Sequence, residues 1–193
     1  MAKRKKESAE KKEWKEGELI KTFKLKRIKE YQTPLMKEWL DISTPPVFDV
    51  VEQGIFDRKL GEALRSLEGW SEEDLKMKFI THILDLGHLN DEGEIVGYFD
   101  KMLSATVEGI KLTVKSDFMI AKGILNVHEN PYFHFQEYKP QLNPSGEPMA
   151  QLLEAFLIGN SKNEIPKPLY GVEIIGKQWT FVIMENKDYC ISK

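Results

Sequence analysis

The sequence predicts an α/β fold in which a mixed β-sheet core is flanked by helices. Three observations support this class. Before about residue 95, apolar residues recur every three or four positions, as they do in helices. Beyond it, short runs rich in β-branched and aromatic residues are separated by glycines, as in strands. One further helical pattern, 148–160, lies among those strands, so helices and strands are expected to share one layered unit.

The chain is expected to comprise a basic, flexible N-terminal arm, 1–32, and one domain, 33–193. Its 193 residues are 41% hydrophobic, which is enough for a single core. Residues 1–30 hold 12 Lys and Arg against six Glu, a charge of +6; because the whole chain carries -3, the remainder carries -9. Such a mixed charged run is typical of a solvated tail. The alternative is an arm that contacts phosphates and makes binding depend on salt.

Helices are predicted at three places before residue 90. Thr33 fits an N-cap and Pro34 the first helical position, and the STPP run at 43–46 ends this helix. A short helix is predicted within 56–70. Ser71 is the expected cap of a longer helix. Its apolar residues recur at helical spacing: Leu75, Phe79, Ile83 and Leu86.

Strands and one helix are predicted for the remainder of the chain. The clearest strand is 109–123. The next, 132–139, is almost continuously apolar or aromatic, which predicts a central strand covered on both faces. Segment 148–160 has the apolar stripe of an amphipathic helix. Two strands around a turn at 176–177 and a short third strand are expected to follow.

The composition excludes several classes of protein. Cys190 is the only cysteine, so the chain has no intramolecular disulfide and no cysteine cluster for zinc. The four histidines form no HExxH pair. There is no run of about 18 apolar residues, and no apolar segment follows the basic N-terminus. We therefore expect a cytoplasmic protein with no membrane partner.

Two charged residues, Glu137 and Lys139, end the predicted central strand. Burying a charge is costly unless it is paired, neutralised or bound to a metal. The same acid-x-Lys pattern occurs at five other places, but those lie in the tail, in helical segments or in a turn. The strand that precedes this one also carries an acid, Asp117. The pattern indicates either a structural ion pair or a functional site.

In these features the chain resembles the PD-(D/E)XK nuclease superfamily, which has the restriction-endonuclease-like fold. Asp117 in VKSDFMI matches the family's aspartate, and Glu137 and Lys139 in FQEYK match the acid and the lysine of its tripeptide. Ser116 stands where the motif has proline. The resemblance covers roughly 60–192 and implies this fold for the domain.

The resemblance implies two more site residues. Gln151 resembles a glutamine that some branches of the family place beside the site, which implies a catalytic role. Glu73 is the candidate for an acid that some members carry on the leading helix, which implies a metal ligand. Acids in a first helical turn are also stabilised by the helix dipole, and that alone would account for Glu73.

The expected site suits Mg²⁺ or Mn²⁺. Asp117 and Glu137 on neighbouring strands would repel each other unless a cation neutralised the pair. With the backbone carbonyl of Tyr138 and water, they would form an oxygen-rich shell that suits these ions and is poor for zinc. Side chains alternate along a strand, so Lys139 would share a face with Glu137 and there hold or deprotonate the attacking water.

The sequence therefore predicts a metal-dependent endo- or exonuclease that hydrolyses phosphodiester bonds, with DNA favoured over RNA. Three alternatives stay open. The protein could be a nuclease-fold binding or regulatory module without catalytic activity. It could be a structural partner protein that docks through its tail and the helix after Thr33. The charged residues could also form an ordinary cross-strand ion network. A homodimer is compatible with each of these interpretations.

Overall fold

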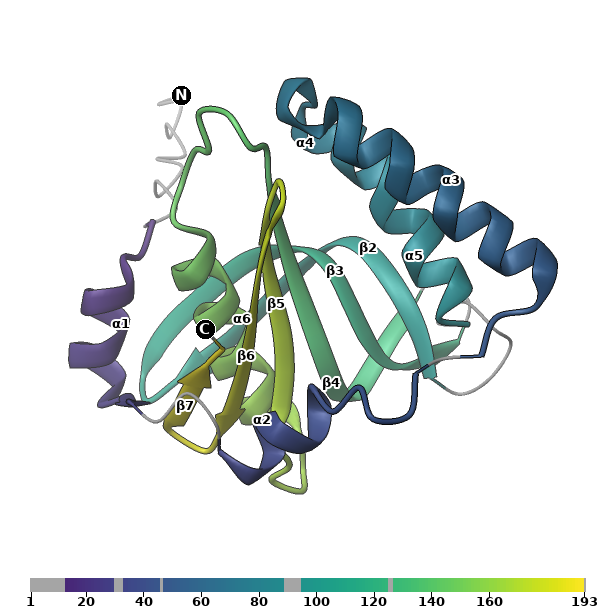
Figure 1. Cartoon of the computed structure of the whole chain (residues 1–193). Helices are drawn as coiled ribbons and strands as arrows, with labels where there is room; N and C mark the ends of the chain where they lie inside the picture. Colours follow the sequence, from purple (N-terminus) through teal and green to yellow (C-terminus); the bar gives the residue numbers. More distant parts are fainter. Residues whose placement is uncertain (1–12, 30–32, 46, 89–94, 125–126, 193) are drawn as a thin grey trace, which may run out of the picture.

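The computed structural model describes residues 13–29, 33–45, 47–88, 95–124 and 127–192, and shows a seven-stranded mixed sheet flanked by helices (Figure 1). The predicted α/β class is thereby confirmed. The helices are α1 (Glu16–Phe23), α2 (Pro34–Trp39), α3 (Val50–Ser66), the 3-10 turn η1 (Leu67–Gly69), α4 (Glu72–Leu75), the π-helical segment η2 (Lys76–Ile80), α5 (Thr81–Leu86) and α6 (Pro148–Lys162). The strands are β1 (Lys26–Ile28), β2 (Ile95–Val107), β3 (Ile110–Ile124), β4 (Val127–Lys139), β5 (Leu169–Ile175), β6 (Gln178–Glu185) and β7 (Asp188–Ile191).

The strand order is β1-β7-β6-β5-β4-β3-β2. Strands β2, β3 and β4 form an antiparallel meander, and so do β5, β6 and β7. The two meanders meet where β4 and β5 pair in parallel, and the connection between these two strands contains α6. Strand β4 has a hydrogen-bonded neighbour on each side, which confirms that it is a central strand.

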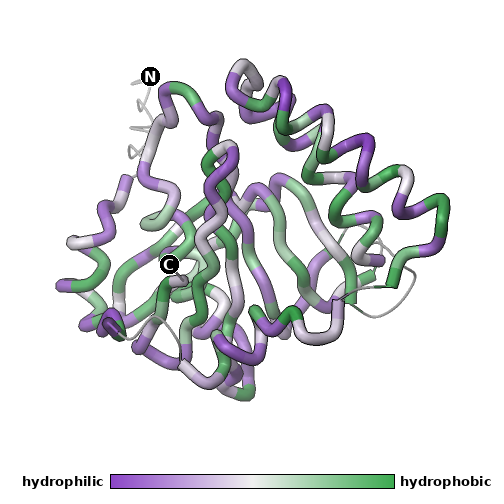
Figure 2. Tube along the Cα trace, in the orientation of Figure 1, coloured by the Kyte–Doolittle hydropathy of each residue, from purple (hydrophilic) through white to green (hydrophobic). Residues whose placement is uncertain are grey.

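Helices cover both faces of the sheet. The core on one face contains Phe156 of α6 and Leu19 of α1, packed with strand residues such as Phe135. The core on the other face joins Phe79 of η2 to Tyr138 of β4. Along α3 and α5, hydrophobic and hydrophilic residues alternate as amphipathic helices require (Figure 2). Phe135 and Tyr138 of β4 therefore contribute to opposite cores.

A glycine allows α6 to lie close to the sheet. A Cβ on Gly171 of β5 would lie 2.7 Å from Cζ of Phe156 and 2.9 Å from the backbone oxygen of Phe135. Real Cβ atoms do not come this close to such neighbours, so a larger residue would push the helix away. Gly171 thereby fixes the position of α6 over the β4–β5 pair.

The predicted helix starts are confirmed. Thr33 caps α2, with its Oγ1 accepting a hydrogen bond from the N–H of Met36 at 3.3 Å. Ser71 caps α4, and the helix after it continues through η2 into α5. The short helix predicted within 56–70 is longer, because Asp49 caps it with a capping box and α3 begins at Val50.

The predicted arm needs a correction, because 13–29 belong to the domain. Leu19 and Phe23 of α1 are buried, and β1 pairs in parallel with β7. The average composition of the arm conceals these apolar residues, which are spaced to form one buried helix face. Residues 1–12 lie outside the described part of the chain.

We expect the Phe23→Ala variant to lower the free energy of unfolding by about 3–5 kcal/mol, the range for deleting a buried aromatic ring. Lys21→Ala, an exposed position on the same helix, is the control and should change it by less than about 0.5 kcal/mol. Urea denaturation measures both. Equal, small effects would show that α1 contributes nothing to the stability of the domain.

Candidate functional site

Four acidic residues lie in a row across four neighbouring strands. Glu137 on β4 is in register with Glu173 on β5. Asp117 on β3 and Glu137 lie directly beyond the last paired positions of their two strands. Asp100 on β2 lies opposite Asp117, between two paired positions. We call these four residues the acid row.

Glu137 is the most constrained member of the row. It is 1% exposed, and both of its carboxylate oxygens are buried without a hydrogen-bond partner, which is true of no other side chain among the described residues. Burial, and then the nearby charge of Asp117, raise the pKa of Glu137 well above its usual range. An ionised carboxylate can only accept hydrogen bonds. Glu137 therefore needs either a proton, which it can share with Asp117, or a cation.

Asp117 has partners for both of its oxygens. The backbone N–H of Tyr138 donates to Oδ2 at 2.8 Å, so the side chain of Asp117 joins β3 to β4 just beyond their paired positions. Its Oδ1 lies 3.8 Å from Nζ of Lys76. The residue is only 6% exposed. The two central carboxylates thus differ, because that of Asp117 is held in place and that of Glu137 is not.

Lys139 carries a positive charge at the same end of β4. Its Nζ donates to the backbone oxygen of Tyr138 at 2.8 Å and lies 3.4 Å from Oε2 of Glu72. Strand alternation puts Lys139 on the face of Glu137. Its charge lowers the pKa of Glu137, but by less than burial and Asp117 raise it. The predicted trio of Asp117, Glu137 and Lys139 is therefore brought together at one end of the central strands.

Glu72, and not the predicted Glu73, is the acid of the leading helix that reaches Lys139. Glu72 pairs with Lys139, whereas Glu73 is exposed and makes no contact with the trio. One position along a helix rotates a side chain by about 100°, so Glu72 and Glu73 point in different directions. Gln151 is half-buried on the first turn of α6, and no described contact joins it to Asp117 or Glu137.

Three other charged residues belong to this region. Glu173 interrupts the apolar run GVEIIG, the same signal that singled out Glu137, and sequence analysis could have found it. Burial raises the pKa of Glu173. Asp100 pairs with Lys115 at 2.7 Å, which holds the pKa of Asp100 below its usual range. Lys76 is one of many lysines in helical segments, and only the structure shows that it is buried.

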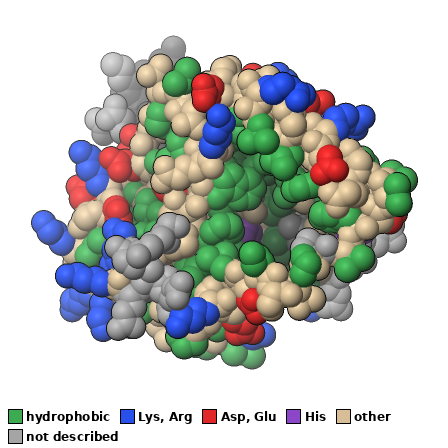
Figure 3. Space-filling model, viewed as in Figure 1, with side chains coloured by type: hydrophobic (Ala, Val, Ile, Leu, Met, Phe, Trp, Pro, Cys, Tyr) green, Lys and Arg blue, Asp and Glu red, His purple; other side chains and the backbone are tan. Residues whose placement is uncertain are grey.

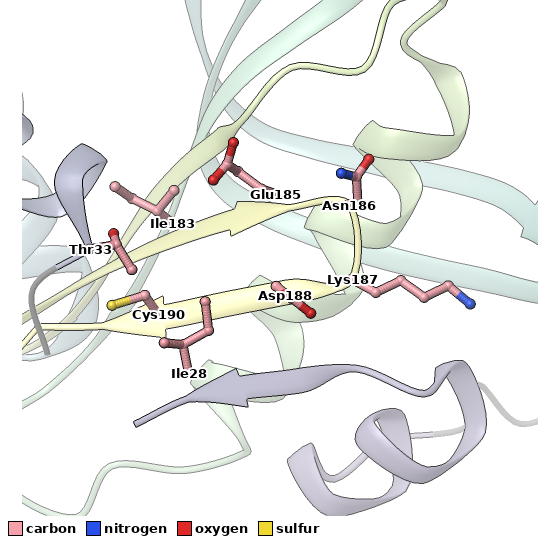
Figure 4. A pocket seen from close by; sticks show the side chains of 8 residues that line it. All are labelled: Ile28, Thr33, Ile183, Glu185, Asn186, Lys187, Asp188 and Cys190. Carbon is pink, nitrogen blue, oxygen red and sulfur yellow. The ribbon is translucent and has the colours of Figure 1, made fainter. Parts of the chain in front are cut away.

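Two cavities lie away from the acid row. One of about 380 Å³ lies between β1 and the β6–β7 hairpin (Figure 4). Its lining is Ile28, Thr33, Ile183, Glu185, Asn186, Lys187, Asp188 and Cys190. The other, also of about 380 Å³, is an apolar hollow between α3, η2 and the β5–β6 hairpin, where Figure 3 shows hydrophobic side chains gathered. Neither contains a member of the acid row, so the candidate site is a cluster of buried charges at the strand ends.

Comparison with known proteins assigns no family. No protein-family model matches the chain, and no curated protein matches it. Within the described ranges, no helix is long and apolar enough to cross a membrane. The same residues contain no group of three or more His, Cys, Asp or Glu side chains arranged around one metal position. Any metal in the acid row would therefore depend on two carboxylates and on backbone or water oxygens.

Without divalent ions, the wild-type protein should lose stability as the pH rises above 4.5, the ordinary pKa of a glutamate, toward the raised pKa of Glu137. In this window the folded state holds a proton that the unfolded state has released, so the free energy of unfolding falls with increasing pH. The Glu137→Gln variant should show a smaller decline, because only the part due to Glu173, whose pKa burial also raises, remains. Urea denaturation in a chelating buffer, repeated across the pH range, measures the difference.

His134 does not disturb this comparison. Burial lowers its pKa to about 4, so His134 destabilises the fold as the pH falls, the opposite direction, and it is present in both proteins. If the difference in stability between wild type and Glu137→Gln did not change with pH, Glu137 would have an ordinary pKa.

Proposed function

We propose that the protein is a metal-dependent nuclease of the PD-(D/E)XK type with a restriction-endonuclease-like fold. The observation that carries this proposal is the buried carboxylate of Glu137, which has no hydrogen-bond partner and lies beside Asp117 and Lys139. A hydrolytic metal site of this class needs an acid pair and a lysine together. The order of elements, from α4 through β2, β3 and β4 to α6 and β5, supports the fold.

The residues present fit Mg²⁺ or Mn²⁺. These hard cations prefer oxygen ligands, and Glu137 offers two oxygens that no protein group occupies. Asp117 would supply Oδ1, and Tyr138 its backbone oxygen, which has a second lone pair beside the one that accepts Nζ of Lys139 at 2.8 Å. When bound, such an ion would polarise the scissile phosphate and lower the pKa of water, so that hydroxide could attack the phosphate.

The protein's own groups complete the chemistry. Lys139, whose Nζ contacts Glu72 and the backbone oxygen of Tyr138, holds or deprotonates the attacking water. Glu72 takes the position predicted for Glu73, but it positions Lys139 and is not a metal ligand. Gln151 stays a predicted catalytic residue at the start of α6.

Nucleic acid binding needs positive charge outside the acid row. Because the chain beyond residue 30 carries -9, the phosphate contacts are expected from the N-terminal 30 residues with their charge of +6. Part of that charge is on exposed residues of α1 and β1, at one edge of the sheet, where Figure 3 shows Lys and Arg side chains. The preference for DNA over RNA rests on the resemblance alone.

The alternative is a nuclease-fold module that binds or regulates without turnover. The observation that favours it is charge compensation, because Lys76, Lys115 and Lys139 already pair with acids in and around the row. A structural ion network needs no metal. The two functions predict different effects of single substitutions on stability, Mn²⁺ binding and cleavage.

We expect Glu137→Gln to abolish Mn²⁺ binding and nicking of plasmid DNA while the metal-free fold keeps its melting temperature, because a neutral amide avoids repulsion by Asp117. Lys139→Met should retain Mn²⁺ binding and lose turnover by about 10²- to 10⁴-fold, the usual contribution of a positioned proton-transfer group. Glu73→Gln, which replaces an exposed acid on α4, is the matched control and should change neither Mn²⁺ binding nor turnover. Thermal shift with and without Mn²⁺, together with cleavage of plasmid DNA and of an RNA oligonucleotide, measures all three.

An ion network gives the opposite pattern. Both Glu137→Gln and Lys139→Met would then lower the melting temperature by similar amounts, since each leaves a buried charge without its partner. Neither the wild type nor any variant would change its melting temperature when Mn²⁺ is added. That result would reject the nuclease proposal.

A further inference from the structure

Lys76 is a buried cation that the proposed chemistry does not use. Its side chain is 7% exposed, and it begins the π-helical segment η2, a type of helix irregularity that often occurs at functional sites. Its Nζ lies 3.4 Å from Oδ1 of Asp100 and 3.8 Å from Oδ1 of Asp117. The ammonium also lies 5.8 Å from the ring centre of Tyr138.

The contacts of Asp117 show which of its oxygens a metal would take. Oδ2 accepts the backbone N–H of Tyr138, a contact fixed by the course of β4. Oδ1 lies 3.8 Å from the ammonium of Lys76, a longer contact. An ion that joins Asp117 to Glu137 would therefore use Oδ1, and it would have to displace Lys76 from that oxygen.

Lys76 has a second acid to which it can turn. Asp100 lies nearer to its Nζ than Asp117 does, so the ammonium can leave Asp117 without becoming an unpaired buried charge. Lys115 is also paired with Asp100 but makes no ion pair with Asp117, and its side chain is 51% exposed. The two lysines therefore differ in that only Lys76 forms an ion pair with Asp117.

We propose that Lys76 is a resident counter-ion that neutralises Asp117 in the metal-free protein and competes with the divalent ion for it. Lys76 thereby sets the affinity of the site for the ion. The inference rests on the proposed metal site. Its physical basis is that an ammonium 3.8 Å from a ligand oxygen repels any second cation at that oxygen.

The test compares Lys76→Met with Lys115→Met in the full chain, with Mn²⁺ as the probe. Lys76→Met should lower the Kd for Mn²⁺ by about tenfold or more, because a charge at this distance in a partly buried site is weakly screened. It should also lower the melting temperature of the metal-free protein, and saturating Mn²⁺ should restore it. Lys115→Met should leave the Kd within about threefold of wild type, since exposed charges interact weakly. Isothermal titration calorimetry measures the Kd for Mn²⁺, and thermal shift measures the melting temperature.

The outcomes separate this inference from the proposed function. If wild type binds Mn²⁺ and Lys76→Met binds it no more tightly, the counter-ion inference is wrong and the metal site stands. If neither wild type nor any folded Lys76 variant binds Mn²⁺, both the counter-ion inference and the proposed metal site are wrong. Lys76→Gln, which is polar but uncharged, replaces Lys76→Met if the latter does not fold, and the same affinity change is expected of it.

Discussion

The structure depends on balancing charge inside the central strands. Strands β2 to β5 each place an acid in one row, and a carboxylate in such surroundings is destabilising unless something compensates it. Lys76, Lys115 and Lys139 provide part of the compensation from η2, β3 and β4. The pairing of β3 with β4 ends where the two central acids begin, and α4 begins at Glu72, next to Lys139. The elements around these acids are arranged so that their charges have partners.

Glu137 is the one member of this group whose buried carboxylate has no hydrogen-bond partner among the described residues, and it is therefore the residue that points to a function. A purely structural network would leave no acid without a partner, since an apolar residue of similar size would fill the same space at lower cost. The chain retains a glutamate whose oxygens accept no hydrogen bond. The proposed nuclease and its inactive alternative both use this feature, and differ in whether the compensating cation comes from solution or from the protein.

Sequence analysis predicts the parts of the structure that depend on local patterns. The apolar run of β4 and the cap at Ser71 each specify an element directly, and the structure confirms them. The helix predicted at 148–160 is confirmed as α6, but 152–159 are all buried, so it is not amphipathic as the apolar stripe predicted. Glu72 and Glu73 could not be separated in this way, because both lie in the first turn of α4 and only the position of that helix over β4 decides which one reaches Lys139. The burial of Lys76, at the start of the π-helical segment, depends on how this helix packs against the sheet, for which local patterns give no signal.

Strand β1 had no sequence signal of its own either, because three residues gain their hydrogen bonds only from β7. This parallel pair joins the first described strand to the last. During synthesis, β1 is made early, but it can pair only after β7 has been made. This edge of the sheet therefore forms late. Contacts this distant in sequence form slowly. Lys26 and Arg27 of β1 are exposed, and charged side chains on an unpaired edge strand oppose its pairing with other chains.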